Sequence, residues 1–300
     1  MSSTTSHITL VGLGNMGTAL AHALVKAGRR VTIWNRAGTR PSVSELVQVG
    51  AGYGPELPRA IAGSSTIIFC VLDYNSIHQV MDPVVTSQGT DAREMDRWMH
   101  KHGAARYFDG GIMVTPQLIS TSTSFILCSG ENEALFNDSD VIDLIIILGR
   151  PHYVASDPGA AALYDLSLLA GMFGMFAGSM TAMALMQKQI HRDGNRPHSP
   201  SGAVKFTLED RVSTLLNPLL NALVPYTLNI AQSITSGRMD ENFGNPMAMV
   251  SMAMQNVLRA CEEEGVDGGS LKYFADLMKA VVDERGGEVG IGWVSTLLTK

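Results

Sequence analysis

This chain of 300 residues has little charge and few cysteine or aromatic residues: 17% of its residues are charged, 6% are aromatic and three are cysteines. Its 22 Lys and Arg residues are scattered, and its formal net charge is −6 at pH 7. Nucleic-acid binding requires a basic patch, so we expect no nucleic-acid partner. The histidines do not stand at metal-ligand spacing from cysteines or carboxylates, and we expect no metal site.

The three cysteines, Cys70, Cys128 and Cys261, lie far apart in the sequence. An odd number of cysteines in apolar surroundings does not suggest a disulfide framework, so we expect reduced thiols in the core and a reducing compartment. Residues 1–6 are polar and too few to hold the basic and apolar regions of a signal peptide. The expected location is therefore the cytoplasm.

One long uncharged run covers residues 166–186 and is about long enough to cross a bilayer. The run is rich in Gly, Ala, Ser and Met and lacks an aromatic belt, so we expect no membrane span. An apolar helix of this kind in a soluble protein is usually buried on every side. The run therefore predicts the spine of a second domain or a dimer interface.

The first strand, predicted over residues 7–11, is followed directly by a glycine-rich motif, Gly12-Leu13-Gly14-Asn15-Met16-Gly17. In a G-x-G-x-x-G turn between a strand and a helix, the first glycine permits the tight turn and the second lets a pyrophosphate approach the backbone. The third allows the helix to pack closely on the strand, and the helix N-terminus binds the phosphates. The motif predicts a dinucleotide site.

The next strand, predicted over residues 31–34, ends at Asn35 and Arg36, where an NAD enzyme would place an Asp or Glu on the ribose. A carboxylate would repel a 2′-phosphate, whereas Arg36 can stack on the adenine or bind the phosphate, and Arg40 follows in the same loop. NADPH is therefore favoured over NADH. The alternative is that both arginines are solvated loop residues.

Strands and helices alternate up to about residue 152, which predicts an α/β fold with a doubly wound parallel sheet of the Rossmann type. After residue 158 the pattern is entirely helical. We expect a cofactor domain over residues 1–158 and an all-α domain over residues 159–300. The strands are predicted near residues 7–11, 31–34, 66–71, 106–109, 124–128 and 151–154, and the later helices near 159–189, 208–236, 246–264, 271–284 and 291–298.

Five segments carry a likeness to a known family: Gly12 to Gly17, Trp34-Asn35-Arg36, Gly110-Gly111-Ile112-Met113, residues 157–166 (DPGAAALYDL) and Asn256-Val257-Leu258-Arg259-Ala260. Over almost its full length the chain resembles the NADP-dependent imine reductases and reductive aminases, a branch of the β-hydroxyacid dehydrogenase superfamily, and its fungal members most. In that family two chains interlock, and each active site lies between one chain's cofactor domain and the other chain's helical domain. The resemblance implies an intertwined homodimer.

Position 165 separates the branches of this superfamily. The hydroxyacid dehydrogenases carry a Lys at the matching place, and this chain has Asp165. A carboxyl group suits a substrate that is cationic when it reacts, because it can protonate an imine or stabilise an iminium ion. Burial against Phe173, Leu168 and Leu169 would favour its protonated form. The alternative is that Asp165 only complements the helix dipole.

The resemblance also implies further cofactor contacts from Val71, Leu72 and Gln88. The last of these stands nearest to the Asn that the family has after its fifth strand. Gln88 lies beside the connection over residues 72–84, which is near the lower length limit for a strand–helix–strand crossover. Either the crossover is compressed or the fifth strand is degraded, and an incorrectly spliced gene would look the same.

The substrate pocket that the resemblance implies is lined by Met113, Phe173, Leu219, Met249 and Val250. Phe173 replaces the Tyr of similar reductive aminases, so a hydroxyl group is missing. The apolar set favours a bulky hydrophobic imine. The methionines at helical spacing are also typical of a core.

These features predict an enzyme that reduces C=N bonds with NADPH, acting on an imine or on a ketone plus an amine, with Asp165 as proton donor or iminium anchor. Two alternatives remain. One is a dehydrogenase of β-hydroxyacids, which Asp165 disfavours because a carboxylate would repel an acid substrate. The other is an NADPH-binding homologue with weakened catalysis, suggested by Phe173, Gln88 and the short crossover.

Overall fold

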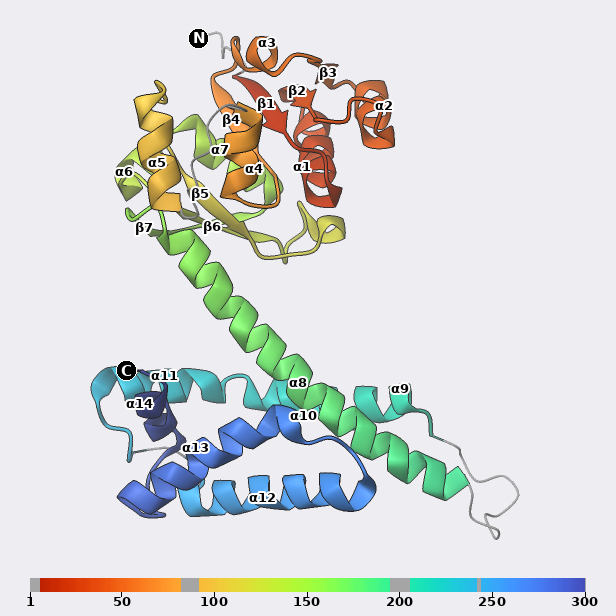
Figure 1. The fold of residues 1–300 in the computed structure, drawn as a ribbon, viewed down its shortest axis with the longest axis vertical. Helices are drawn as coiled ribbons and strands as arrows, with labels where there is room; N and C mark the ends of the chain where they lie inside the picture. The colour runs from red at the N-terminus through yellow and green to blue at the C-terminus, as the bar shows by residue number, and fades with distance from the viewer. Residues whose placement is uncertain (1–5, 82–91, 195–205, 242–243, 300) are drawn as a thin grey trace. The chain divides into compact units, whose positions relative to one another are not determined.

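The computed structural model describes residues 6–81, 92–194, 206–241 and 244–299. The chain forms two compact units, residues 1–169 and 170–300. They are considered separately below (Figure 1). The expected fifth strand near residues 83–86 and Gln88 lie outside the described residues.

The first unit begins with a parallel sheet in the order β3-β2-β1-β4. The order is that of a doubly wound fold, and the helices follow the strands as crossovers. Its strands are β1 (His7–Val11), β2 (Arg30–Trp34), β3 (Gly52–Tyr53) and β4 (Thr66–Phe69), and its helices are α1 (Asn15–Lys26), α2 (Pro41–Gln48), α3 (Leu57–Ile61) and α4 (Tyr74–Met81). The predicted Rossmann-type fold is confirmed, although the two-residue strand β3 was not predicted.

A second sheet of the same unit has the order β5-β6-β7. Its strands are β5 (Asp109–Ile112), β6 (Phe125–Ser129) and β7 (Arg150–Ala155), accompanied by α5 (Ala92–Lys101), η1 (Pro116–Leu118), α6 (Glu133–Asn137) and α7 (Asp140–Leu148). The prediction of an all-parallel arrangement with a strand at 106–109 was wrong in two respects. The strand starts three residues later, because the Tyr107 N–H bonds the Glu131 carboxylate 3.3 Å away, and β5 runs antiparallel to β6.

One hydrophobic core joins the two sheets. Alternate residues of β1 and β2, such as Ile8, Leu10 and Ile33, are fully buried in the same cluster as Phe136 of α6 and Leu144 of α7. The apolar side chains on one face of each strand therefore pack against the apolar side chains on one face of each helix. The cysteines are free thiols, with Cys128 and Cys261 buried as expected and Cys70 partly buried.

The second unit is helical, as predicted. It contains the later part of α8 (Ala160–Gly194) followed by α9 (Leu208–Arg211), the π-helical turn η2 (Val212–Leu216), α10 (Asn217–Leu223), α11 (Tyr226–Ser236), α12 (Met247–Glu264), α13 (Gly269–Arg285), η3 (Ile291–Trp293) and α14 (Val294–Leu298). Met247, Met278, Val281 and Val294 form its buried cluster. Thr207 begins α9 with a capping box in which its side chain and that of Asp210 bond each other's backbone N–H.

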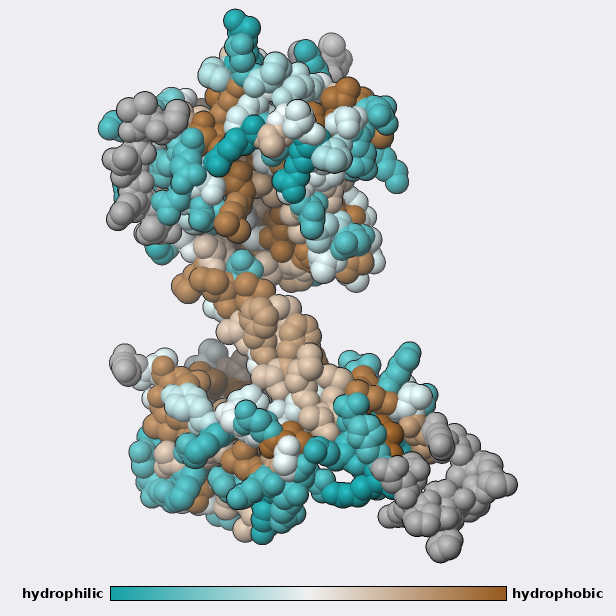
Figure 2. Space-filling model, turned by 45° about the vertical axis from the view of Figure 1, so that its right-hand side comes forward, coloured by the Kyte–Doolittle hydropathy of each residue, from teal (hydrophilic) through white to brown (hydrophobic). Residues whose placement is uncertain are grey.

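Helix α8 does not have the buried surface that its composition predicts. Leu166, Phe173 and Met180 are each 60–64% exposed in the single chain, and Figure 2 shows a continuous apolar surface along the helix. The expectation of burial on every side is therefore wrong for one chain alone. By length and composition, residues Ala160–Arg192 would also suffice for a membrane span, but a single such helix is weak evidence for one.

Candidate active site

The glycine turn after β1 has the shape that a dinucleotide requires. Gly12 has φ +98°, and a Cβ there would lie 2.4 Å from the Cys70 carbonyl oxygen. A Cβ on Gly17 would lie 2.0 Å from the Gly12 carbonyl oxygen, so α1 packs closely on the turn. At Gly14, by contrast, a Cβ would meet no atom of the described residues within 4 Å. Gly12 and Gly17 thus shape the turn, and Gly14 faces open space.

The N-terminus of α1 opens onto that same space. Gly14 is its N-cap residue and provides no side-chain cap. The first backbone N–H groups of a helix have no partner within the helix and attract anions. The turn with Asn15 and Met16 therefore fits a pyrophosphate without any basic side chain, on the geometry of the backbone alone.

Asn35 connects the glycine turn to the end of β2. Its side-chain oxygen accepts a hydrogen bond of 3.1 Å from the Leu13 N–H, and its side-chain nitrogen donates one of 3.0 Å to the Ala37 carbonyl. Both ends of the amide are thus used inside the protein. The structure gives Asn35 a role in shaping the site, where the sequence alone suggested a cofactor contact.

Arg36 and Arg40 are exposed and lie in the segment that follows β2. The Arg36 guanidinium donates to the Gln79 side chain of α4 at 3.4 Å, and Arg40 is the N-cap residue of α2. Of the other predicted cofactor residues, Val71 lies against the turn, since a Cβ on Gly12 would approach its Cγ1 to 2.9 Å. Leu72 is 93% exposed.

Asp165 lies on the first part of α8, against the face of β5. A Cβ on Gly111 would be 3.3 Å from the Cβ of Asp165 and 3.4 Å from the Cε of Met113. The absence of a side chain at Gly111 therefore lets α8 approach the strand. Burial raises the pKa of Asp165 above its ordinary value.

The expected neighbours of Asp165 differ in how far they are buried. Leu168 is 48% exposed and Phe173 is 60% exposed in the single chain, whereas Leu169 is partly buried. The approach of Asp165 to β5 at Gly111 was not predicted. The raised pKa agrees in direction with the expectation.

A second carboxyl group, Asp109, was not among the predicted site residues. It begins β5, and the Tyr74 hydroxyl of α4 donates a hydrogen bond of 3.0 Å to its Oδ1. Burial raises the pKa of Asp109, the charge of Asp165 adds to the increase, and the bonds from Tyr74 and the Gly110 backbone oppose it. A carboxylate directly before Gly110-Gly111 at a strand end is the sequence signal that could have identified it.

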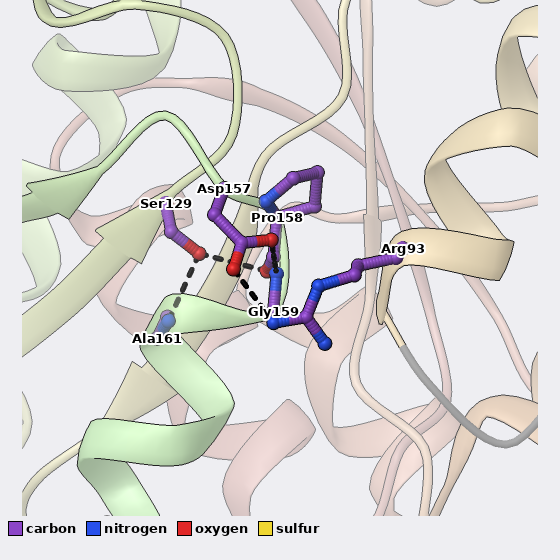
Figure 3. Close-up of polar contacts among 6 residues, drawn as sticks. All are labelled: Arg93, Ser129, Asp157, Pro158, Gly159 and Ala161. Carbon is purple, nitrogen blue, oxygen red and sulfur yellow. Dashed lines mark hydrogen bonds and ion pairs between the residues drawn. The ribbon is translucent and has the colours of Figure 1, made fainter.

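The start of α8 is fixed to the sheet and to α5 by polar contacts (Figure 3). The Ser129 hydroxyl accepts from the Ala161 N–H at 3.0 Å and donates to the Pro158 carbonyl at 2.8 Å. Asp157 accepts from the Gly159 N–H at 3.1 Å and pairs with Arg93 of α5 at 2.6 Å. These contacts fix the position from which Asp165 projects one turn later.

We expect Ser129→Ala to lower the free energy of unfolding by about 1–3 kcal/mol, because a buried donor and a buried acceptor lose their partner. Ser129 is fully buried. The control is Ser167→Ala, whose exposed hydroxyl bonds the Leu163 carbonyl of its own helix, with an expected change within about 0.5 kcal/mol. Urea unfolding of the full chain measures both, and equal stability of the two variants would contradict the anchoring role.

The remaining predicted pocket residues belong to the second unit. Phe173 of α8, Leu219 of α10 and Met249 of α12 are 56–60% exposed. Val250 instead packs against the buried cluster around Met247. Met113 lies in the first unit, next to Gly111. Among the described residues, no group of three or more His, Cys, Asp or Glu could hold a metal ion.

A glycine turn that fits a pyrophosphate, a doubly wound sheet and a helical second unit together define a dinucleotide-dependent oxidoreductase. Comparison with known families agrees. Residues 7–144 match the NAD binding domain of 6-phosphogluconate dehydrogenase, and residues 157–300 match the C-terminal domain of the NADPH-dependent reductive aminase-like proteins.

Individual relatives narrow the class. The chain is 32% identical over 295 residues to the NADPH-dependent reductive aminase of Aspergillus oryzae, with 94% of each chain covered. The reductive aminase of Aspergillus terreus, solved in complex with NADPH4, cyclohexanone and allyl amine, is 30% identical, with a TM-score of 0.83 over 99% of this chain and 100% of that one. An imine reductase of the same organism, in complex with NADPH4 and dibenz[c,e]azepine, is 31% identical, with a TM-score of 0.80 over 98% of this chain and 100% of that one. The chain belongs to the family of NADPH-dependent reductive aminases and imine reductases.

Proposed function

We propose that this protein reduces C=N bonds with NADPH and that Asp165 is its proton donor. The observation that carries the proposal is the position of this carboxyl group, set against β5 by an anchored helix, with a pKa raised by burial. The full-length similarity to reductive aminases and imine reductases supports the reaction class.

The chain's own residues account for binding and proton transfer. Gly14 and the N-terminus of α1 hold the pyrophosphate, and Arg36 and Arg40 hold the 2′-phosphate. Bound NADPH supplies the hydride that reduces the carbon of the C=N bond. The Asp165 carboxyl donates its proton to the imine nitrogen, becomes a carboxylate, and then stabilises the iminium cation until that cation is neutralised.

The test is NADPH oxidation with a panel of cyclic imines and of ketone-plus-amine pairs, with NADH in parallel. Imine-dependent oxidation with a preference for NADPH supports the proposal. Tight NADPH binding without turnover of any imine would instead favour the homologue with weakened catalysis. Oxidation of 3-hydroxy acids with NADP⁺ would favour the hydroxyacid dehydrogenase.

The proposed substrate is an imine, or a ketone together with an amine, of bulky hydrophobic character. Phe173, Leu219 and Met249 present large apolar side chains to solvent in the single chain, and we assign them with Met113 to the substrate pocket. Val250 contributes through its packing against the buried cluster around Met247. The proposed location is the cytoplasm.

We also propose a homodimer joined through α8. Its exposed apolar residues, including Leu166, Phe176 and Met180, form a hydrophobic surface. Such an exposed surface is typical of a protein interface. A second copy of the same helix would cover it. Light scattering should give twice the chain mass of 32.2 kDa, and a monomer at micromolar concentration would contradict the assignment.

A further inference from the structure

Asp109 and the residues around it form a cluster of titratable groups that the reaction described so far does not use. Asp109 and Gly111 are separated by two positions on β5, so they face the same side of the sheet. Ser129 and Leu127 stand directly opposite them on β6 and share that side. The start of α8 lies on this face, bonded at Ser129 and in contact at Gly111.

The carboxyl group of Asp109 is therefore fixed on the face that Asp165 covers. Tyr74 holds it from α4 through the hydroxyl bond of 3.0 Å. Asp165 reaches the same face through its Cβ at Gly111, two residues along the strand. We propose that Asp109 is a positioning residue for the reduction, forming with Asp165 an electrostatically coupled pair of carboxyl groups that retains one proton.

Other ionisable groups lie around the pair of Asp109 and Asp165. Tyr107, just before β5, has its pKa raised by burial and by Asp109, far above neutrality. Burial and Asp109 raise the pKa of Cys128 on β6 to about 12. Tyr74 is the hydrogen-bond donor to Asp109, and Asp96 of α5 acts on Tyr107. Among the described residues, Asp165 is the carboxyl group whose charge raises the pKa of Asp109.

The coupling has a catalytic consequence if Asp165 is the proton donor, so this inference rests on the proposed function. An ionised Asp109 disfavours the ionisation of Asp165, and the reverse holds equally. The pair thus keeps a proton to higher pH than a single carboxyl group would. Asp165 then remains able to donate a proton closer to neutral pH, where a lone aspartate would be ionised.

Two measurements test the pair on the whole protein. The first measurement is the pH profile of kcat/KM for an imine. Asp109→Asn should shift its basic limb to lower pH by about one unit, because coupled sites interact by about one pKa unit or more. The kcat at low pH should be retained. A merely structural role would lower activity at every pH without moving the limb. The control is Asp138→Asn, an exposed carboxyl at the end of α6, which should leave the limb in place.

Carbon-13 NMR titration of the aspartate carboxyls gives a readout independent of activity. Two coupled carboxyl groups release their protons in two macroscopic steps. Asp165→Asn and Asp109→Asn should each leave one carboxyl that titrates in a single step, with a midpoint below the upper step of the unaltered protein. Tyr74→Phe should raise the midpoint of Asp109. Unmoved midpoints would overturn the pair. Lowered midpoints in both variants without a moved limb would support the pair and overturn Asp165 as proton donor.

Discussion

Asp165→Asn should lower kcat for imine reduction by about 10²–10⁴-fold, which is the range that a positioned general acid contributes. Asparagine keeps the size of the side chain and its place beside Gly111 but has no carboxyl proton to donate and no negative charge to stabilise an iminium ion. The loss should therefore fall on kcat, while the dissociation constant of NADPH stays the same.

Steady-state kinetics and a fluorescence titration with NADPH measure the two quantities. Asp138→Asn serves again as control, because it removes one exposed carboxylate from the same unit and should change neither. If Asp165→Asn kept the activity of the unaltered protein, the proton would have to come from solvent or another group. Asp165 would then act only on the helix dipole.

Gly17→Ala should lower the stability of the protein and Gly14→Ala should leave it unchanged, while both weaken NADPH binding. At Gly17 the new methyl group would lie 2.0 Å from the Gly12 carbonyl oxygen, and relieving this contact should cost about 1–3 kcal/mol or more. At Gly14 the backbone has φ −70° and ψ −174°, which alanine adopts without strain, and no described atom stands within 4 Å.

Thermal unfolding without cofactor separates the two variants. Gly17→Ala should unfold at a clearly lower temperature, and Gly14→Ala at the temperature of the unaltered protein. With NADPH, Gly14→Ala should bind at least about tenfold more weakly, equal to about 1.4 kcal/mol, because its methyl group occupies the space of the pyrophosphate. Undiminished binding by Gly14→Ala would place the pyrophosphate away from this turn.

The parts of the fold that the sequence predicts best are those encoded by local patterns. The glycine turn, the period-two strands around it and the later helices depend on neighbouring residues. The antiparallel course of β5 depends on pairing with β6, whose partner residues lie 14 to 20 positions away. Gly110-Gly111 has little strand propensity, so the exact place of this strand was not readable from the segment alone.

For Asp165, too, the residue itself could be read from the sequence, whereas its surroundings depend on contacts between distant parts of the chain. A carboxyl group at this position was evident from the chain, but its neighbours come from separate elements. Asp109 and Tyr74 are 35 residues apart in sequence, and only the packing of α4 on β5 joins them. Composition likewise showed that α8 is apolar, but it could not show whether one chain or two would cover it.

The amide of Asn35 bears on how the coenzyme preference of this enzyme could be changed. An aspartate there, as in enzymes that use NADH, could still accept from the Leu13 N–H but would set a carboxylate oxygen against the Ala37 carbonyl. The phosphate loop and the ribose end of the site are joined in part through this side chain. A change of preference from NADPH to NADH is therefore better sought at Arg36 and Arg40. Substitutions there leave the Asn35 bonds to the phosphate loop in place.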